Sequence, residues 1–146
     1  MNNVRYCRIC WNTNGWQKPS GDAPKLETQS YVQTNGFGHE EWLFNFGRTT
    51  GKYKYSFIQG FNTKNQKYQN SIFDVILYTI SSTRRYFVGQ IKDCKILSEE
   101  EADEISRIYK QQGWLDEMVE DVKKVNGNYK LLLSERNPLF LLNVTL

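Results

Sequence analysis

The side chains best suited to acid–base chemistry gather in one segment, Gly36-Phe37-Gly38-His39-Glu40-Glu41-Trp42-Leu43-Phe44-Asn45-Phe46. It holds the only histidine of the 146-residue chain, followed directly by two glutamates. Histidine and carboxylates are common general acids and bases, so one reading is a small enzyme that uses His39 with Glu40 or Glu41. The residue order from Glu41 predicts a short strand, however, and neighbours on a strand point to opposite faces. The three groups would then not converge.

Aromatic side chains suggest a different chemistry, which is the stacking of nucleobases. The expected strand 41–46 carries Trp42, Phe44 and Phe46 on one face, so it is either a core strand or the wall of an aromatic pocket. Two more tryptophans lie in the segment 11–21, where Asn-Gly and Pro-Ser-Gly predict turns. They either line a site or pack beneath the loop as a satellite core.

Aromatic walls can hold a base, while amide or carboxylate groups read its edge. The candidate walls are Trp11, Trp16, Trp42, Phe44 and Tyr55. The candidate edge-reading groups are Asn12, Asn14, Glu41 and Gln59.

Charge is distributed unevenly along the chain. Residues 1–97 carry a net charge of +7 and residues 98–146 carry −4, within a total of +3. A basic, aromatic-rich front part suits nucleic acid, although a β-rich core followed by solvated acidic helices explains it equally well. The candidate phosphate contacts are Lys18, Lys25, Lys52, Lys54, Arg84 and Arg85.

Metal, cofactor and nucleophile motifs give little support for catalysis. Cys7 and Cys10 have C-x-x-C spacing, but structural zinc needs four ligands and only Cys94 and His39 remain as candidates. The sequence contains no phosphate-binding P-loop, dinucleotide fingerprint or G-x-S-x-G elbow. We therefore expect no catalytic residues, metal or cofactor in this chain.

The periodicity predicts an α+β domain with a curved, mostly antiparallel sheet or partial barrel and two C-terminal helices. We expect strands at 4–11, 41–46, 53–61, 72–80, 86–97 and 139–144, with 41–46 and 53–61 forming a hairpin. Ser98 and Glu101 form a capping box for a helix to about Gln112, a second helix covers 115–125, and 62–71 is a polar loop. We expect one domain over 1–146, cut from a longer protein. Three cysteines and no apolar leader or span favour the cytoplasm.

Two motifs carry a family resemblance, best over residues 4–97. These are the loop Trp-Asn-x-x-Gly-Trp-x-x-Pro-Ser-Gly at 11–21 and the stretch Gly-x-Gly-x-Glu-Glu-Trp-Leu-Phe at 36–44. Together with the later strands and helices, the pattern resembles the N-terminal specificity modules of bacterial modification-dependent restriction proteins. The residues that match are Trp11, Asn12, Trp16, Ser20, Gly21, Trp42 and Phe44.

The resemblance implies a PUA-like fold of the EVE and YTH group. It implies a reader of a modified base in double-stranded DNA, which flips that base into an aromatic pocket as part of an antiviral restriction system. The resemblance also implies that such a module is joined to an HNH nuclease or to a GTP-driven motor partner, so cleavage would belong to an attached or partner nuclease and not to this chain. The alternatives are an RNA-binding PUA-like domain, a protein-interaction module of a larger assembly, and the small enzyme described above.

Overall fold

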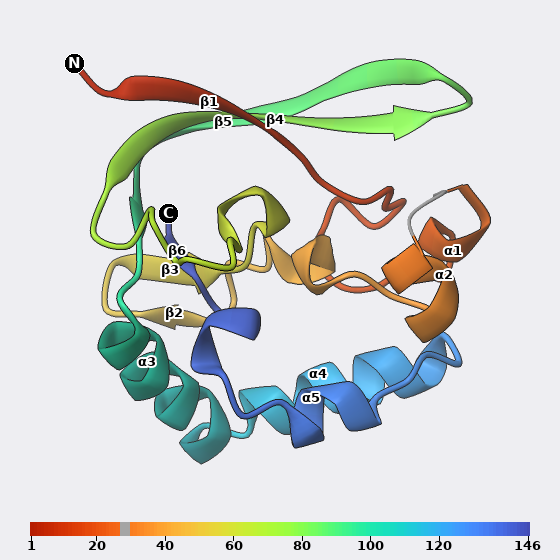
Figure 1. The fold of residues 1–146 in the computed structure, drawn as a ribbon. Helices are drawn as coiled ribbons and strands as arrows, with labels where there is room; N and C mark the ends of the chain where they lie inside the picture. Colours follow the sequence, from red (N-terminus) through yellow and green to blue (C-terminus); the bar gives the residue numbers. More distant parts are fainter. Residues whose placement is uncertain (27–29) are drawn as a thin grey trace.

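Six strands form one open, mixed sheet in the order β1-β4-β5-β6-β3-β2 (Figure 1). The computed structural model describes residues 1–26 and 30–146. Among the strands of these described residues, β1 and β4 pair in parallel and the other neighbouring pairs are antiparallel. The predicted α+β class with a mostly antiparallel sheet is therefore confirmed, and the sheet does not close into a barrel. The strands are β1 (Asn3–Arg8), β2 (Thr49–Thr50), β3 (Tyr53–Ser56), β4 (Ile72–Ser81), β5 (Arg84–Ile96) and β6 (Val144–Thr145).

The long β4–β5 hairpin joins the two halves of the sheet. Alternate residues of β4 are buried, as expected for a strand with one face on the core. β5 pairs with β4 along most of its length and with β6 through its last two residues. The register shifts between the pairs Leu77–Gly89 and Tyr78–Phe87, where β5 has one more residue than β4, as in a β-bulge.

The helices lie together on one side of the sheet (Figure 1). Ser98 caps α3 (Glu99–Gln111) with the reciprocal Ser98–Glu101 box that the sequence predicts. Gly113 follows with φ 76°, so the chain turns directly into α4 (Trp114–Lys124). The remaining helical segments are α1 (Ala23–Leu26), α2 (Ser30–Asn35), α5 (Lys130–Ser134) and the 3-10 turns η1 (His39–Trp42), η2 (Gln59–Phe61) and η3 (Pro138–Phe140). No described helix is long and apolar enough to cross a membrane.

Two predicted strands were wrong. Segment 41–46 is not a strand, because η1 occupies His39–Trp42, so the expected hairpin with 53–61 does not form. β3 pairs with β2 and β6 instead. Segment 139–144 contributes only Val144 to a strand, because Pro138 begins η3 and the Asn137 side chain caps it.

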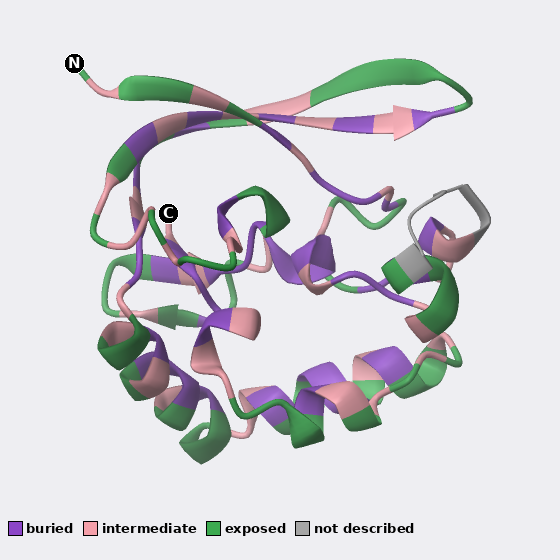
Figure 2. Cartoon of the chain, in the orientation of Figure 1, coloured by how far each residue is buried: buried purple, intermediate pink, exposed green. Residues whose placement is uncertain are grey.

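Buried residues, coloured purple on the chain in Figure 2, form two large clusters. One lies between the helices and η1 and includes Phe37, Trp42 and Tyr109. The other lies beneath β1, β4 and β5 and includes Cys7 and Cys94. Segment η1 lies where the two clusters meet, since Trp42 belongs to the first and Leu43 to the second. The chain around the lone histidine therefore links the helical layer to the sheet.

Candidate functional site

A cavity of about 620 Å³ opens between η1, α2, η2 and the segment from Glu135 to Phe140. Its volume lies in the range of small-molecule and nucleobase sites. Its lining residues are Cys10, Tyr31, Val32, Gly38, His39, Glu40, Phe57, Gln59, Asn62, Glu135 and Phe140. Of the residues that the sequence predicts for a base pocket, Gln59 is the one that lines this cavity.

His39 is held in a fixed orientation at the cavity wall. Its Nδ1 lies 2.6 Å from the carbonyl oxygen of Phe140, and its Nε2 lies 2.8 Å from the Tyr31 hydroxyl. A carbonyl can only accept, so Nδ1 carries the proton and Nε2 accepts from Tyr31. The ring stacks on Phe37 at a centroid distance of 5.4 Å. Burial lowers the pKa of His39, against smaller opposing effects of Phe140 and Glu135, so the ring is neutral at pH 7.

Glu40 and Glu41 act as anchors for the backbone. Glu40 accepts from the backbone N–H of Cys10 at 2.9 Å and from that of Gln59 at 2.8 Å, which ties the segment after β1 to η2. Glu41 is fully buried and accepts from Gly38 N–H at 3.0 Å. Burial raises the pKa of Glu41, although its hydrogen bonds act in the opposite direction.

The loop 11–21 is built around Asn12 rather than around its tryptophans. The Asn12 carbonyl oxygen accepts from the backbone N–H groups of Asn14 and Trp16, at 2.6 and 2.9 Å. Its amide donates to the Lys18 carbonyl at 2.8 Å and to Glu41 Oε1 at 3.0 Å. Asn12 therefore holds the loop closed against η1 and is itself buried.

Trp16, Ser20 and Gly21 complete this loop without reaching the cavity lining. The Trp16 indole donates to the Cys10 carbonyl at 2.9 Å, and its backbone lies in the left-handed region at φ 57°. Ser20 N–H donates to Glu41 Oε1 at 3.3 Å. Gly21 has φ 80°, and an added Cβ would contact Val125 of the helical layer at 3.4 Å. These residues give the loop its shape.

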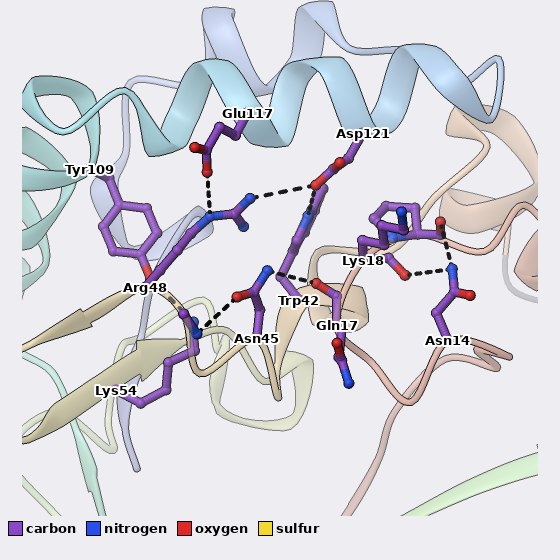
Figure 3. Close-up of polar contacts among 12 residues, drawn as sticks. Asn14, Gln17, Lys18, Trp42, Asn45, Arg48, Lys54, Tyr109, Glu117 and Asp121 are labelled. Carbon is purple, nitrogen blue, oxygen red and sulfur yellow. Dashed lines mark hydrogen bonds and ion pairs between the residues drawn. The ribbon is translucent and has the colours of Figure 1, made fainter.

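Trp42 belongs to the core (Figure 3). Its side chain is 2 % exposed, and its indole N–H donates to Asp121 of α4 at 3.0 Å. Arg48 Nη2 also lies 3.6 Å from Asp121, and its Nε donates to Glu117 at 3.2 Å. Trp42 therefore fixes η1 to α4 and does not form a wall of the cavity.

The other predicted pocket walls lie in separate places. Trp11 packs edge-on against Tyr86 of β5 at a centroid distance of 6.0 Å. Phe44 packs on the cluster beneath the sheet, and Tyr55 packs on the helical cluster. The structure therefore does not bring the predicted aromatic set into one pocket.

The predicted phosphate contacts are also dispersed. Lys18 and Lys52 are exposed, and the side chain of Lys25 lies outside the described part of the structure. Arg84 and Arg85 are exposed at the tip of the β4–β5 hairpin, across the molecule from the β2–β3 turn that carries Lys52 (Figure 1).

Lys54, drawn beside Tyr109 in Figure 3, is buried instead of exposed. Its Nζ lies 3.3 Å from the Tyr109 hydroxyl. Burial and then the neighbouring Arg48 lower its pKa from 10.5 to about 8. A lysine in this position does not contact a phosphate at the surface.

The sequence alone did not single out most of the cavity. Tyr31, Phe57 and Phe140 supply aromatic walls from three distant segments, and Asn62 and Glu135 supply polar groups. No local sequence pattern marks these residues as part of a site. Their convergence is visible only in the three-dimensional structure.

The lining residues that the sequence did single out are His39 and Glu40, as acid–base candidates, and Gln59, as an edge-reading group. Gly38 beside His39 allows close packing, because a Cβ there would lie 2.6 Å from Cys10 Sγ.

Over residues 1–26 and 30–146, no cluster of three or more His, Cys, Asp or Glu side chains is arranged to hold a metal ion. Comparison of the chain with family models, curated proteins and solved structures gave no match.

Proposed function

We propose that this chain is a nucleic-acid-binding specificity domain that takes one extruded, modified DNA base into the cavity beside His39. The cavity of about 620 Å³ is the observation that carries the proposal. Reading of a modified base, and a place in a restriction system, rest on the family resemblance of the motifs at 11–21 and 36–44.

The cavity walls suit a planar, uncharged ring. Phe57, Phe140 and Tyr31 offer apolar and aromatic surface for stacking. The side chains of Gln59 and Asn62 add amide donors and acceptors at the rim, which can read a base edge by hydrogen bonds. These two features together are what an extruded base requires.

The charge of the lining limits what part of a nucleotide can enter. The charged side chains at the described cavity wall are the acids Glu40 and Glu135, and the histidine beside Glu40, His39, is neutral. Acids repel a phosphate and attract exocyclic amino groups, which favours cytosine or adenine over thymine. The phosphates would remain outside, where Lys64 and Arg136 are exposed beside the lining residues Asn62 and Glu135.

The proposal assigns binding and no catalysis to this chain. The carboxylates of Glu40 and Glu41 accept hydrogen bonds from backbone N–H groups. Both ring nitrogens of His39 are also hydrogen-bonded, one to the Phe140 carbonyl and the other to the Tyr31 hydroxyl. Groups occupied in this way position the backbone around the cavity. Cleavage would come from an attached or partner nuclease.

A duplex titration tests the proposal. One duplex is prepared unmodified and with 5-methylcytosine, 5-hydroxymethylcytosine or N6-methyladenine, and each form is titrated at two salt concentrations. We expect one modified form to bind more tightly than the unmodified duplex, and high salt to weaken binding. Gln59→Ala and Asn62→Ala should each reduce that preference by about three- to tenfold, because each removes one hydrogen-bonding group.

Gln111→Ala is the matched control, because Gln111 is an exposed amide at the end of α3, away from the cavity lining. It should bind as the unaltered chain does. If no duplex is bound, or if the two cavity variants keep the full preference, the base-reading proposal is wrong. Binding of RNA alone would instead support an RNA-binding domain, and salt-insensitive capture of one protein would support an interaction module.

A further inference from the structure

The face of β1, β4 and β5 that points away from the helices carries exposed aromatic side chains. Tyr6 of β1 is 73 % exposed and Phe87 of β5 is 72 % exposed. The buried residues of β4 point the other way, toward the core. In the described part of the chain, no helix covers this outer face (Figure 1).

Strand register brings the aromatic residues into one band across the three strands. Tyr6 is in register with Ile76, and Tyr78 is in register with Phe87. Residues directly opposite on neighbouring strands share a face, with Cβ atoms about 4.5–5.5 Å apart. The band therefore runs from Tyr6 across β4 to Phe87, over two strand spacings of about 4.8 Å each.

Positive charge flanks this band. Arg8 is in register with Tyr78, and Arg85 is in register with Ile80. The Arg85 guanidinium carbon lies 5.8 Å from the centre of the Tyr78 ring, so the guanidinium makes a cation–π contact with this band. The acids Asp74 and Asp93 lie together near the other end of the β4–β5 hairpin, where the Asn2 amide donates to both and the Asp93 backbone N–H donates to Asp74.

We propose that this outer face, Tyr6, Tyr78 and Phe87 with Arg8 and Arg85, binds single-stranded nucleic acid. Unpaired bases stack on exposed Tyr6 and Phe87, while the arginines hold the phosphates. In a duplex the faces of the bases are stacked on one another and cannot contact these rings, so the surface selects unpaired strands. The core of a protein-binding surface is usually poor in charge, whereas arginines flank the central Tyr78 here. This surface is separate from the cavity and stands whether or not the cavity takes a base.

Fluorescence anisotropy with labelled oligothymidylate and oligouridylate of about 12 nucleotides tests this proposal. We expect Tyr6→Ala and Phe87→Ala each to weaken binding at least about fivefold, since each removes one stacking platform. Arg85→Ala should weaken binding and lower the slope of log K against log salt by about one. Phe46→Ala is the matched control, because Phe46 is 62 % exposed but lies outside the sheet.

The outcomes separate this proposal from the cavity proposal. Oligothymidylate binding should survive Gln59→Ala, and any preference for a modified duplex should survive Phe87→Ala. If Phe87→Ala and Phe46→Ala affect the oligomers equally, or if neither oligomer binds, the outer face is not a strand-binding surface. If Phe87→Ala instead converts a dimer to a monomer in sedimentation, the face joins two copies of this chain and the proposal is overturned.

Discussion

Replacing Asn12 with aspartate tests whether the buried Asn12 side chain holds the loop 11–21 closed against Glu41. The change is isosteric, so one carboxylate oxygen keeps the bonds from the Asn14 and Trp16 backbone N–H groups. The other oxygen replaces the amide, and it then faces the Lys18 carbonyl at 2.8 Å and Glu41 Oε1 at 3.0 Å. Two donated bonds become two contacts between acceptors, one of them between carboxylates.

The expected cost follows from these contacts. Two unit charges about 3 Å apart repel by about 5 kcal/mol at an effective dielectric constant of about 20. The two carboxylates avoid this repulsion if one of them binds a proton, which costs about 4 kcal/mol at pH 7 for an ordinary carboxyl. The lost bond to Lys18 adds about 1 kcal/mol. We therefore expect Asn12→Asp to lower the free energy of unfolding by about 5 kcal/mol at pH 7, a large part of the stability of an ordinary domain.

The dependence on pH identifies the cause. A carboxyl whose pKa is raised on folding binds a proton in the folded state that the unfolded state has already released, so the variant loses stability as pH rises. Lowering the pH from 7 to 5 should recover about 3 kcal/mol of the difference from the unaltered chain. Urea unfolding followed by circular dichroism at both pH values measures this difference.

Asn65→Asp is the control, because it adds the same charge at an exposed loop position. It should change stability by less than about 0.5 kcal/mol at either pH. A loss at Asn12 below about 1 kcal/mol, or one that is the same at pH 5 and pH 7, would refute the contact between Asn12 and Glu41 as the reason this loop is closed.

Three further predictions concern buried groups. Trp42→Ala should lower the free energy of unfolding by about 3–5 kcal/mol in urea titration, because the side chain is 2 % exposed and bonded to Asp121; unchanged stability would place it outside the core. Lys54→Met should raise stability at pH 7 by on the order of 3 kcal/mol, because burial lowers the lysine pKa to about 8 and the cation is disfavoured below that pH. The gain should shrink toward pH 10, where the folded lysine is neutral. Burial lowers the pKa of His39, so stability is complete above about pH 6.5 and falls as pH drops below it; His39→Gln should flatten that fall.

Sequence periodicity predicted the elements whose pattern is local. The capping box at Ser98 and the strand expected at 72–80 each depend on residues within a few positions, and each is present, as α3 and β4. The same reasoning failed at 41–46. A run of acids and aromatics reads as a strand, but Glu40 and Glu41 find backbone donors in Cys10, Gln59 and Gly38, which stabilises a 3-10 turn.

The candidate site was harder to predict because distant segments build it. Tyr31, Phe57 and Phe140 are separated by tens of residues, and no local pattern marks them as neighbours. The prediction of Lys54 as a phosphate contact also failed. Its place in an alternating strand suggested a surface cation, but the side chain packs against Tyr109. Burial of a polar residue depends on the tertiary partners that receive it.

The anchors around His39 explain how a cavity can exist so close to the core. Glu40 accepts from the Cys10 N–H through one carboxylate oxygen and from the Gln59 N–H through the other, so two lining residues are fixed by one side chain. The Phe140 carbonyl fixes the histidine ring from the C-terminal segment. A wall tied at these points cannot collapse inward without breaking charged or buried hydrogen bonds, at about 1–3 kcal/mol for each group left unsatisfied. The cavity is therefore pre-formed, and a ligand that enters it does not have to open it first.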